Sequence, residues 1–263
     1  MKMKKIIALF LAVFITTCLF CSCGSGNDSS SGAESDKLVI ATSPDFPPFE
    51  SLDSEGNVSG IEIDILELIC EKMGKTLEIE QMDFESVLPG VQAEKFDVGV
   101  SGITITEKRQ KNVLFTNPYC LAAQAIVVVE QSPITCKADL EGKAVSVQTG
   151  TTAETFCMEN GYTVSSFAAN SDAENALVSG KVDAWVIDDL TAAEMVKAYN
   201  SQGETQLVIL DEAMTTEPYA FALAFGNEEL VESMNSILDT LISDGTISQI
   251  FDKYDAPYTS PIE

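Results

Sequence analysis

The stretch V-S-G-I-T-I-T-E-K-R, residues Val100–Arg109, decides how the rest of the chain is interpreted. It begins at the end of an apolar strand and runs through a polar turn toward the start of a helix. Ser101, Gly102 and Thr104 offer small hydroxyls and bare backbone to a compact ligand. Arg109 adds a planar, always charged guanidinium that matches a carboxylate in two parallel hydrogen bonds. The segment therefore predicts a site for the α-carboxylate of a free amino acid. The alternative is a strand-to-helix connection whose arginine pairs with a surface acid.

Upstream of this stretch, two more polar loops follow apolar strands. Residues 37–42 form a β-branched run that ends in S-P-D-F-P-P-F-E, residues 43–50, where the prolines predict an irregular loop. The alternating strand 77–81 leads into residues 82–84, and residues 61–72 between these strands have helical spacing. This order predicts a parallel α/β sheet, in which ligands bind beyond the carboxyl ends of the strands. The three loops are therefore expected to meet at one rim.

The middle of the chain repeats this pattern. One strand ends at Gln148, and the helix that follows it begins just after Thr151 and Thr152. Hydroxyls and free amides at a helix N-terminus can hold a carboxylate, although ordinary capping is the alternative. A later strand ends at Asp188 and Asp189. These two acids could pair with a ligand ammonium, or one of them could cap the next helix.

The composition narrows the classes of function. The 263 residues include 41 acidic and 15 basic ones, and the formal net charge is −26. Such a charge repels phosphate backbones and argues against nucleic-acid binding. The chain has no histidine, which excludes Ser-His and Cys-His catalysis and any His-ligated metal site. We expect neither a metal nor a cofactor.

The N-terminus has the pattern of an export signal. A head with three lysines, a short apolar run and a small-residue exit predict a signal peptide over residues 1–22, too short to be a confident membrane span. The exit is similar to a bacterial lipoprotein signal, with Cys23 the best candidate for lipidation and Cys18 and Cys21 as competitors. Residues 23–36 then predict a flexible tether. The body is expected to be exported and lipid-anchored to the outer face of the bacterial cell membrane.

Four cysteines remain in the predicted folded body, and they show no CxxC spacing. An even number in an exported protein permits disulfides, and four cysteines allow three full pairings. A chain of this length does not need such cross-links, so we expect mostly free, buried thiols. The four are Cys70, Cys120, Cys136 and Cys157.

A set of short motifs occurs in a fixed order along most of the body, roughly residues 38–254. In chain order the motifs are Pro47–Glu50, Gly60–Asp64, Met82–Phe84, Gly102–Arg109, Phe115–Tyr119, Val182–Ala184 with Asp188, Glu217–Tyr219 and Asp244–Thr246. Each motif is weak alone, but the ordered set is specific. The chain thereby resembles the substrate-binding proteins of polar amino-acid ABC importers, the family 3 extracellular solute-binding proteins, in its bacterial lipoprotein form.

The resemblance implies the type II periplasmic-binding-protein-like fold. In that fold, two Rossmann-like α/β lobes are joined by two hinge strands and close on the ligand. The first lobe would comprise residues 37–124 and 220–255, and the second residues 125–219. Residues 256–263 are expected to form a loose tail.

The resemblance also implies roles for residues that match the family's motifs. Arg109 would clamp the ligand carboxylate, supported by Thr104 and the amides around Ser101 and Gly102, and Asp188 would hold the α-ammonium. Two aromatic rings would enclose the ligand side chain, and donors after the middle strand would reach the carboxylate from the second lobe. The rings are those of Phe46 and Phe84, and the second-lobe residues are Gln148, Thr151 and Thr152.

The side-chain specificity is less determined. Members that select basic or amide side chains often carry an acid where this chain has Ser43. Asp45 or Glu50 could supply a substitute negative group, depending on the conformation of their loop. We expect a polar amino acid, with basic, amide and sulfur-containing side chains all open.

The expected function is therefore capture without chemistry. A monomeric, membrane-anchored protein would bind a free amino acid and deliver it to the permease of an ABC importer. One alternative is a ligand-sensing lipoprotein that reports to a receptor. Another is a dehydratase-like enzyme on the same fold, for which Glu50 is the nearest candidate acid.

Overall fold

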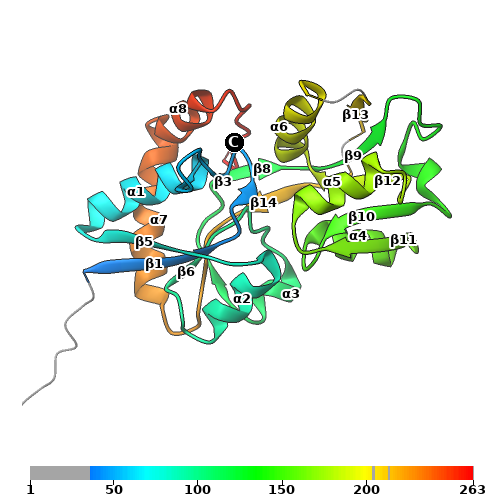
Figure 1. Ribbon diagram of the computed structural model, residues 1–263. Helices are drawn as coiled ribbons and strands as arrows, with labels where there is room; N and C mark the ends of the chain where they lie inside the picture. The colour runs from blue at the N-terminus through cyan, green and yellow to red at the C-terminus, as the bar shows by residue number, and fades with distance from the viewer. Residues whose placement is uncertain (1–35, 203–204, 213, 263) are drawn as a thin grey trace, which may run out of the picture. The chain divides into compact units, whose positions relative to one another are not determined.

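Two five-stranded sheets organise the part of the chain that the computed structural model describes, residues 36–202, 205–212 and 214–262. The first sheet has the strand order β5-β1-β6-β15-β7, and the second has the order β11-β10-β12-β9-β13. We call the part built on the first sheet the first lobe and the part built on the second sheet the second lobe (Figure 1). This is the two-lobe α/β architecture that the sequence predicts.

The first lobe contains both ends of the described chain. Its sheet strands are β1 (Lys37–Thr42), β5 (Thr76–Gln81), β6 (Val98–Gly99), β7 (Leu114–Phe115) and β15 (Ala222–Leu223). A small antiparallel sheet adds β2 (Asp45–Phe46), β3 (Glu50–Leu52) and β4 (Val58–Ser59). The helices are α1 (Ile61–Met73), α2 (Phe84–Gln92), α3 (Glu107–Gln110), α7 (Glu228–Ser243) and α8 (Thr246–Lys253).

The second lobe is built from the middle of the chain. Its strands are β9 (Gln124–Val129), β10 (Ala144–Gln148), β11 (Thr163–Phe167), β12 (Ala184–Asp188) and β13 (Leu207–Ile209). Its helices are α4 (Thr152–Glu159), α5 (Asn170–Val178) and α6 (Asp189–Asn200), with a 3-10 turn, η1, at Lys137–Leu140.

Each sheet separates two hydrophobic layers, because successive side chains of a strand point to opposite faces. In β1, Leu38 and Ile40 belong to the core that α1, α7 and α8 share, whereas Ala41 packs with Phe84 and Val87 of α2. Helices therefore cover both faces of the sheet, and the loops at its carboxyl edge are left to form a site.

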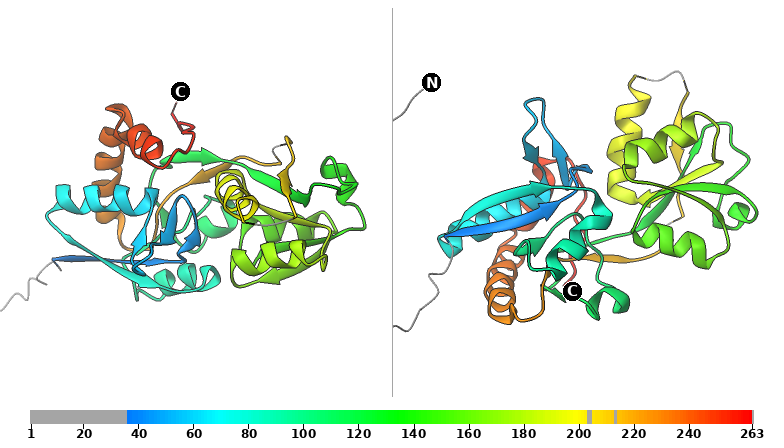
Figure 2. Two further views of the ribbon diagram at one scale, coloured as in Figure 1. Left: turned by 45° about the horizontal axis from the view of Figure 1, so that its top comes forward. Right: turned by 60° about the horizontal axis from the view of Figure 1, so that its bottom comes forward.

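Two strands that run side by side connect the lobes. They are β8 (Cys120–Ala122) and β14 (Glu217–Tyr219), which pair antiparallel with Glu217 opposite Ala122. Both views in Figure 2 show these strands passing between the lobes. The pair is short and carries the chain across and back, as a hinge requires.

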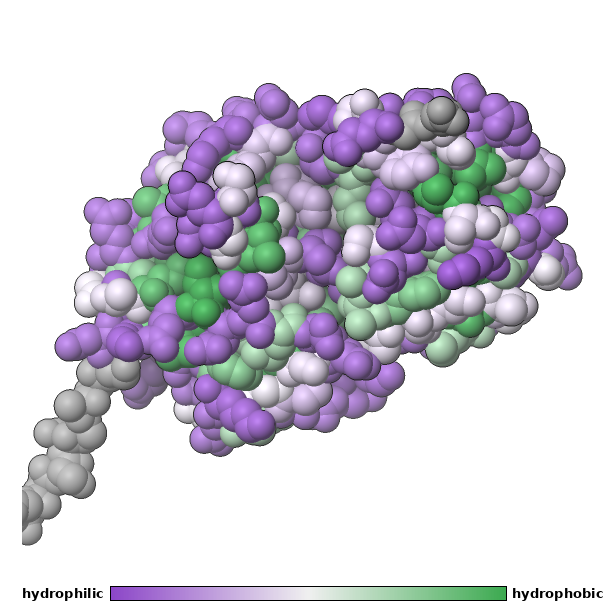
Figure 3. Space-filling model, in the orientation of Figure 1, coloured by the Kyte–Doolittle hydropathy of each residue, from purple (hydrophilic) through white to green (hydrophobic). Residues whose placement is uncertain are grey.

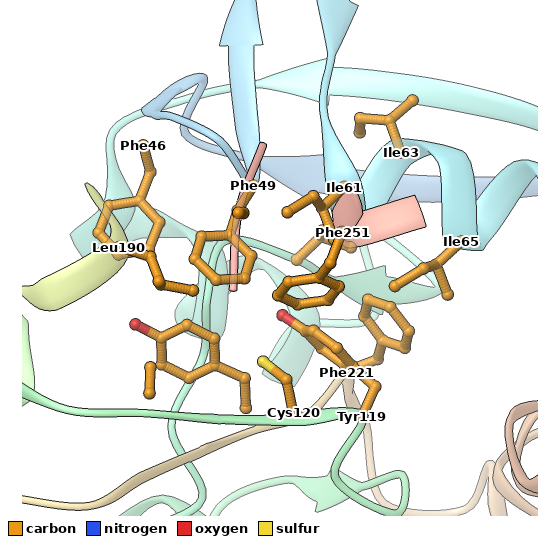
Figure 4. Packing of buried hydrophobic residues seen from close by; sticks show 14 of the residues in the cluster. Phe46, Phe49, Ile61, Ile63, Ile65, Tyr119, Cys120, Leu190, Phe221 and Phe251 are labelled. Atoms are coloured by element: carbon orange, nitrogen blue, oxygen red, sulfur yellow. The ribbon is translucent and has the colours of Figure 1, made fainter. Parts of the chain in front are cut away.

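An aromatic cluster fixes the hinge to the first lobe. The Phe49 ring lies 5.1 Å from that of Tyr219 on β14 and 6.0 Å from that of Phe251 on α8. Tyr119, just before β8, stacks on Phe221 at 5.1 Å. Figure 4 shows this packing, with Leu190 of the second lobe beside Phe46. Because these rings are buried, the start of the hinge is held firmly by the first lobe.

Three expectations need correction. The sheets are mixed rather than parallel, because strands that enter from the hinge run in the opposite direction: β15 is antiparallel to β6, and β9 is antiparallel to β12. The loop 43–50 is not irregular throughout, since β2 and β3 pair within it. The described tail is not loose, because Tyr258 packs on Phe251 and the amide of Leu121 donates to the carbonyl of Thr259.

The cysteines of the folded body are all free, so none of the three full pairings occurs. Cys70, Cys120 and Cys157 are buried, and Cys136 is partly buried. Burial raises the pKa of the Cys157 thiol to about 12, which makes it a poor nucleophile. The predicted signal peptide, Cys23 and nearly all of the tether lie outside the described residues.

The visible face of the molecule is largely polar, as the excess of acidic residues predicts. The face shown in Figure 3 is mostly hydrophilic, with small hydrophobic patches on each lobe. Within the described residues, every helix is too short or too polar to span a bilayer.

Candidate functional site

A small cavity lies between the two lobes. Its lining combines residues from the loops after β1, β5 and β6 in the first lobe with residues after β10 and β12 in the second. Ten of the thirteen predicted ligand contacts line it: Phe46, Phe84, Ser101, Gly102, Thr104, Arg109, Gln148, Thr151, Thr152 and Asp188. A larger, more open groove shares four of these residues, but only the smaller cavity is lined by both Arg109 and Asp188. We therefore take the smaller cavity as the candidate site.

Arg109 brings a positive charge to the cavity. It lies in α3, where the Thr106 hydroxyl accepts a hydrogen bond from its backbone amide at 3.1 Å. Its guanidinium donates to the carbonyl of Thr104 at 2.9 Å and to that of Gly150, in the second lobe, at 3.2 Å. Burial lowers the pKa of Arg109, and nearby negative side chains oppose this shift. A guanidinium has five N–H donors and stays charged, so it can still bind a carboxylate.

The loop after β6 is held in an uncommon conformation by buried acids. Ser101 has a φ of 143°, which side chains other than glycine rarely adopt. Its hydroxyl donates to Glu50 at 2.6 Å, and the amide of Gly102 donates to Glu62 at 2.9 Å. The Tyr119 hydroxyl in turn donates to Glu62 at 2.7 Å. Such strain persists only where the surroundings determine it, and these contacts fix the loop before any ligand arrives.

Both the backbone conformation at residue 102 and the close approach of neighbouring rings require a glycine there. Its φ is 56°, and a Cβ there would lie 2.5 Å from the Phe46 ring and 3.2 Å from the Tyr219 ring. The bare backbone of Gly102 therefore allows the aromatic wall of the cavity to approach it closely.

Asp188 brings a carboxyl group from the other lobe. It ends β12, is only 9% exposed, and accepts a hydrogen bond from the Tyr219 hydroxyl. Asp188 does not cap α6 through its side chain. Asp189 instead accepts from the amides of Leu190 at 2.8 Å and Ala123 at 3.2 Å. Of the two acids, it is therefore Asp189 whose side chain binds a backbone amide at the start of α6. Asp188 lines the cavity.

The charge state of Asp188 follows from its surroundings. Burial, and then the negative charge of Glu217, raise its pKa to about 8. The hydrogen bond from Tyr219 and the positive charge of Arg109 act in the opposite direction. The carboxyl is therefore mostly protonated at neutral pH until a cation approaches it.

The start of α4 forms the second-lobe wall. The Thr151 hydroxyl accepts from the amide of Glu154 at 3.1 Å and donates to the carbonyl of Gln148 at 2.7 Å. Thr152 accepts from the side-chain amide of Gln124 at 2.9 Å. The Thr151 hydroxyl thus caps α4, which is the ordinary capping role that the sequence left open as the alternative. The helix N-terminus itself still lines the cavity beside Arg109 and favours an anion there.

Three predicted contacts lie outside the cavity lining. Glu50 is fully buried behind the loop after β6, where it accepts from Ser101. Burial and the neighbouring Glu62 raise the pKa of Glu50 well above its usual value. Asp45 bonds instead to the second lobe, and the Ser43 hydroxyl donates to Asp45 at 2.9 Å. Neither of the two acids expected to supply a negative group, Asp45 and Glu50, lines the cavity.

Sequence reasoning missed three residues that build the site. Tyr219 donates to Asp188 and packs on Phe46 and Phe49. Glu62 accepts from the amide of Gly102, and Glu217 adds to the effect of burial in raising the pKa of Asp188. Their signal was present, because Glu62 lies in the G-I-E-I-D motif and the other two in E-P-Y. Among the described residues, no group of three or more acids or cysteines is placed to hold a metal.

Comparisons with known proteins agree with this arrangement. Residues 38–256 match the family described as bacterial extracellular solute-binding proteins, family 3. The chain is 30% identical over 257 residues to the arginine-binding extracellular protein ArtP of Bacillus subtilis, covering 96% of this chain and 98% of that protein.

Two solved structures are similar over most of the chain. An ancestral arginine-binding protein bound to arginine has a TM-score of 0.78 and 38% identity, covering 83% of this chain and 98% of that chain. An ancestral amino-acid-binding protein, described as a precursor of cyclohexadienyl dehydratase, has a TM-score of 0.77 and 32% identity. It covers 83% of this chain and 95% of that one.

Gly102→Ala tests how tightly the cavity wall is built. We expect it to lower the free energy of unfolding by about 2–4 kcal/mol, the sum of a left-handed backbone cost and a clash with Phe46. Gly142→Ala is the matched control, because its φ is 71° and its Cβ would meet nothing within 4 Å. It should cost only about 1 kcal/mol. Urea denaturation measures both, and equal losses would contradict the close approach to Phe46.

Proposed function

The chain belongs to the bacterial extracellular solute-binding proteins of family 3, and from this premise we propose that it captures a free amino acid for an ABC importer. The observation that carries the proposal is the pair of opposite charges, Arg109 and Asp188, that line one cavity from different lobes. A free amino acid carries a carboxylate and an ammonium on one carbon. Both charges are therefore complementary to the two ends of the same small ligand.

Capture would proceed by closure of the lobes. In the open form, the ligand carboxylate meets Arg109 on the first lobe. Closure then brings Asp188 to the ammonium and the N-terminus of α4 to the carboxylate. A ligand with both groups stabilises the closed form more than the open form, and this difference in affinity shifts the population. The closed form would deliver its ligand to a membrane permease.

The lining favours a long polar or cationic side chain. Phe46 and Phe84 contribute aromatic rings to the cavity, and an aromatic face attracts a guanidinium or an ammonium. The Arg109 guanidinium already lies 5.7 Å from the Phe84 ring centroid. ArtP and the ancestral structure are both named for arginine. We therefore propose a basic amino acid as the ligand, with arginine the first to test.

The wider setting follows from the sequence. We propose that residues 1–22 direct export and that lipidation of Cys23 anchors a monomer at the outer face of the membrane. We further propose that the site binds its ligand without chemical change. The acid considered for a dehydratase, Glu50, lies outside the cavity lining and bonds to Ser101, which supports binding over catalysis.

Arg109→Ala tests the proposal. Isothermal titration calorimetry, after a thermal-shift screen of all free amino acids, should show tight binding of one or a few of them to the unchanged protein. The substitution should weaken that binding by about 2–5 kcal/mol, a factor of about 30 to several thousand, because it leaves a buried carboxylate unpaired. Lys108→Ala, which removes an exposed neighbouring charge, should bind normally. Unchanged affinity in Arg109→Ala would refute the proposed site.

The raised pKa of Asp188 predicts that binding releases a proton. Below pH 8 the empty site holds Asp188 mostly protonated, whereas the bound ammonium requires its carboxylate form. The dissociation constant should therefore fall about tenfold per pH unit as the pH rises toward 8, and level off above it.

Titrations at pH 7 in two buffers of different ionisation enthalpy measure the proton directly. Nearly one proton should leave per ligand bound, and Asp188→Asn should abolish this release while weakening binding. A pH-independent dissociation constant between pH 6 and 8 would show that Asp188 does not hold the ammonium.

A further inference from the structure

A partly buried polar cluster joins the two lobes beside the cavity. It consists of Asp45 on β2 of the first lobe and Gln148 and Asn170 of the second. The side-chain amide of Gln148 donates to the two carboxylate oxygens of Asp45 at 3.1 and 3.3 Å. The backbone amide of Asn170 donates to Asp45 at 2.8 Å. Gln148 and Asn170 are almost fully buried and Asp45 is partly buried, so these bonds are partly shielded from water.

The bond to Asn170 completes a helix of the other lobe. Asn170 is the first residue of α5, and the position before it is Ala169, whose side chain cannot cap a helix. The first turn of a helix leaves backbone N–H groups without partners and carries partial positive charge. The carboxylate of Asp45, 125 residues away in sequence, takes the place of the missing cap.

The remaining contacts hold this carboxylate in place. The Ser43 hydroxyl donates to Asp45 at 2.9 Å from within the same lobe. Gln148 is fixed by two further bonds, one to the carbonyl of Ala168 at 3.0 Å and one from the Asn170 side chain at 3.1 Å. Asp45 is thus satisfied by donors of the protein and does not line the ligand cavity. The contact joins the two lobes without any contribution from a ligand.

We propose that Asp45 is a positioning residue that latches the closed form by capping α5 across the gap between the lobes. When the lobes separate, Asp45 and the N-terminus of α5 both exchange this contact for water. The latch therefore favours closure in the empty protein and slows ligand release, since a bound ligand escapes only after the lobes open. The latch also slows association, because the ligand enters the open form and the latch lowers the fraction of empty protein that is open. The kinetic part rests on the proposed amino-acid binding, whereas the closure of the empty protein does not.

Three variants of the full chain test the latch. Asp45→Ala removes the acceptor, and Asp45→Asn keeps one oxygen that can still cap α5, since asparagine caps helices about as well as aspartate. Asp53→Ala is the matched control, because Asp53 also accepts from backbone amides, those of Glu55 and Asn57, but within its own turn of the first lobe. Circular dichroism verifies that each variant is folded.

Small-angle X-ray scattering of the empty protein measures its radius of gyration, which is smaller when the lobes are closed. Asp45→Ala should have a larger radius of gyration than the unchanged protein, Asp45→Asn an intermediate one, and Asp53→Ala the same one. In stopped-flow experiments with arginine, or with the amino acid found by the screen, Asp45→Ala should release ligand about tenfold faster. It should also bind ligand faster, because more of the empty protein is open.

Equal radii for Asp45→Ala and the unchanged protein would overturn the latch, and so would equal release rates. A slower association with unchanged release would also overturn it, because that result would make Asp45 a determinant of ligand entry. If the unchanged protein binds no amino acid, the proposed function fails, but the scattering comparison still decides whether the latch exists.

Discussion

A guanidinium and a carboxyl group, held on separate lobes beside one cavity, are the pair of groups on which the structure depends. Burial disfavours the charged form of both groups: it lowers the pKa of Arg109 and raises that of Asp188 to about 8. Within the described part of the chain, no salt bridge joins the two side chains directly. Arg109 donates to backbone carbonyls and Asp188 accepts from Tyr219, so a bound zwitterion would add an oppositely charged partner to each. Because the two side chains belong to different lobes, a ligand that pairs with both of them stabilises the closed form.

The first lobe holds its part of the site in a fixed conformation, and the hinge connects it to the second lobe. The loop after β6 is fixed from behind by Glu50 and Glu62, and the aromatic cluster ties Tyr219 to the first lobe. Tyr219 also donates to Asp188 of the second lobe, so the hinge strand itself contacts the charge that moves. Preorganisation of the first lobe means that little ordering remains to be done when a ligand arrives.

Much of the fold and site could be predicted because the signals are local. Strand ends can be found from β-branched runs, and parallel strands bring their following loops to one edge. Arg109, Asp188 and Thr152 were placed in this way, with family motifs narrowing the choice. The tight turn at Gly102 fits the same reasoning, since only a bare backbone accepts a ring so close.

The residues that sequence reasoning misplaced depend on contacts between distant segments. Nothing local to Asp45 indicates that its partner is the amide of Asn170, 125 positions away. Glu50 looks like a ligand contact in its P-P-F-E loop, yet the pairing of β2 with β3 places it behind the cavity wall. The antiparallel direction of the strands next to the hinge could not be predicted from the local sequence either. It follows from the path of the chain, which crosses from one lobe to the other and returns.

The most direct measurement compares arginine with two of its analogues by calorimetry at pH 8. Agmatine lacks the carboxylate that Arg109 would bind, and Nα-acetylarginine lacks the ammonium that Asp188 would bind. The account predicts that each analogue binds at least about a hundredfold more weakly than arginine, since each leaves one buried charge unpaired. Binding of either analogue as tightly as arginine would contradict the claim that the two lobes hold opposite ends of one zwitterion.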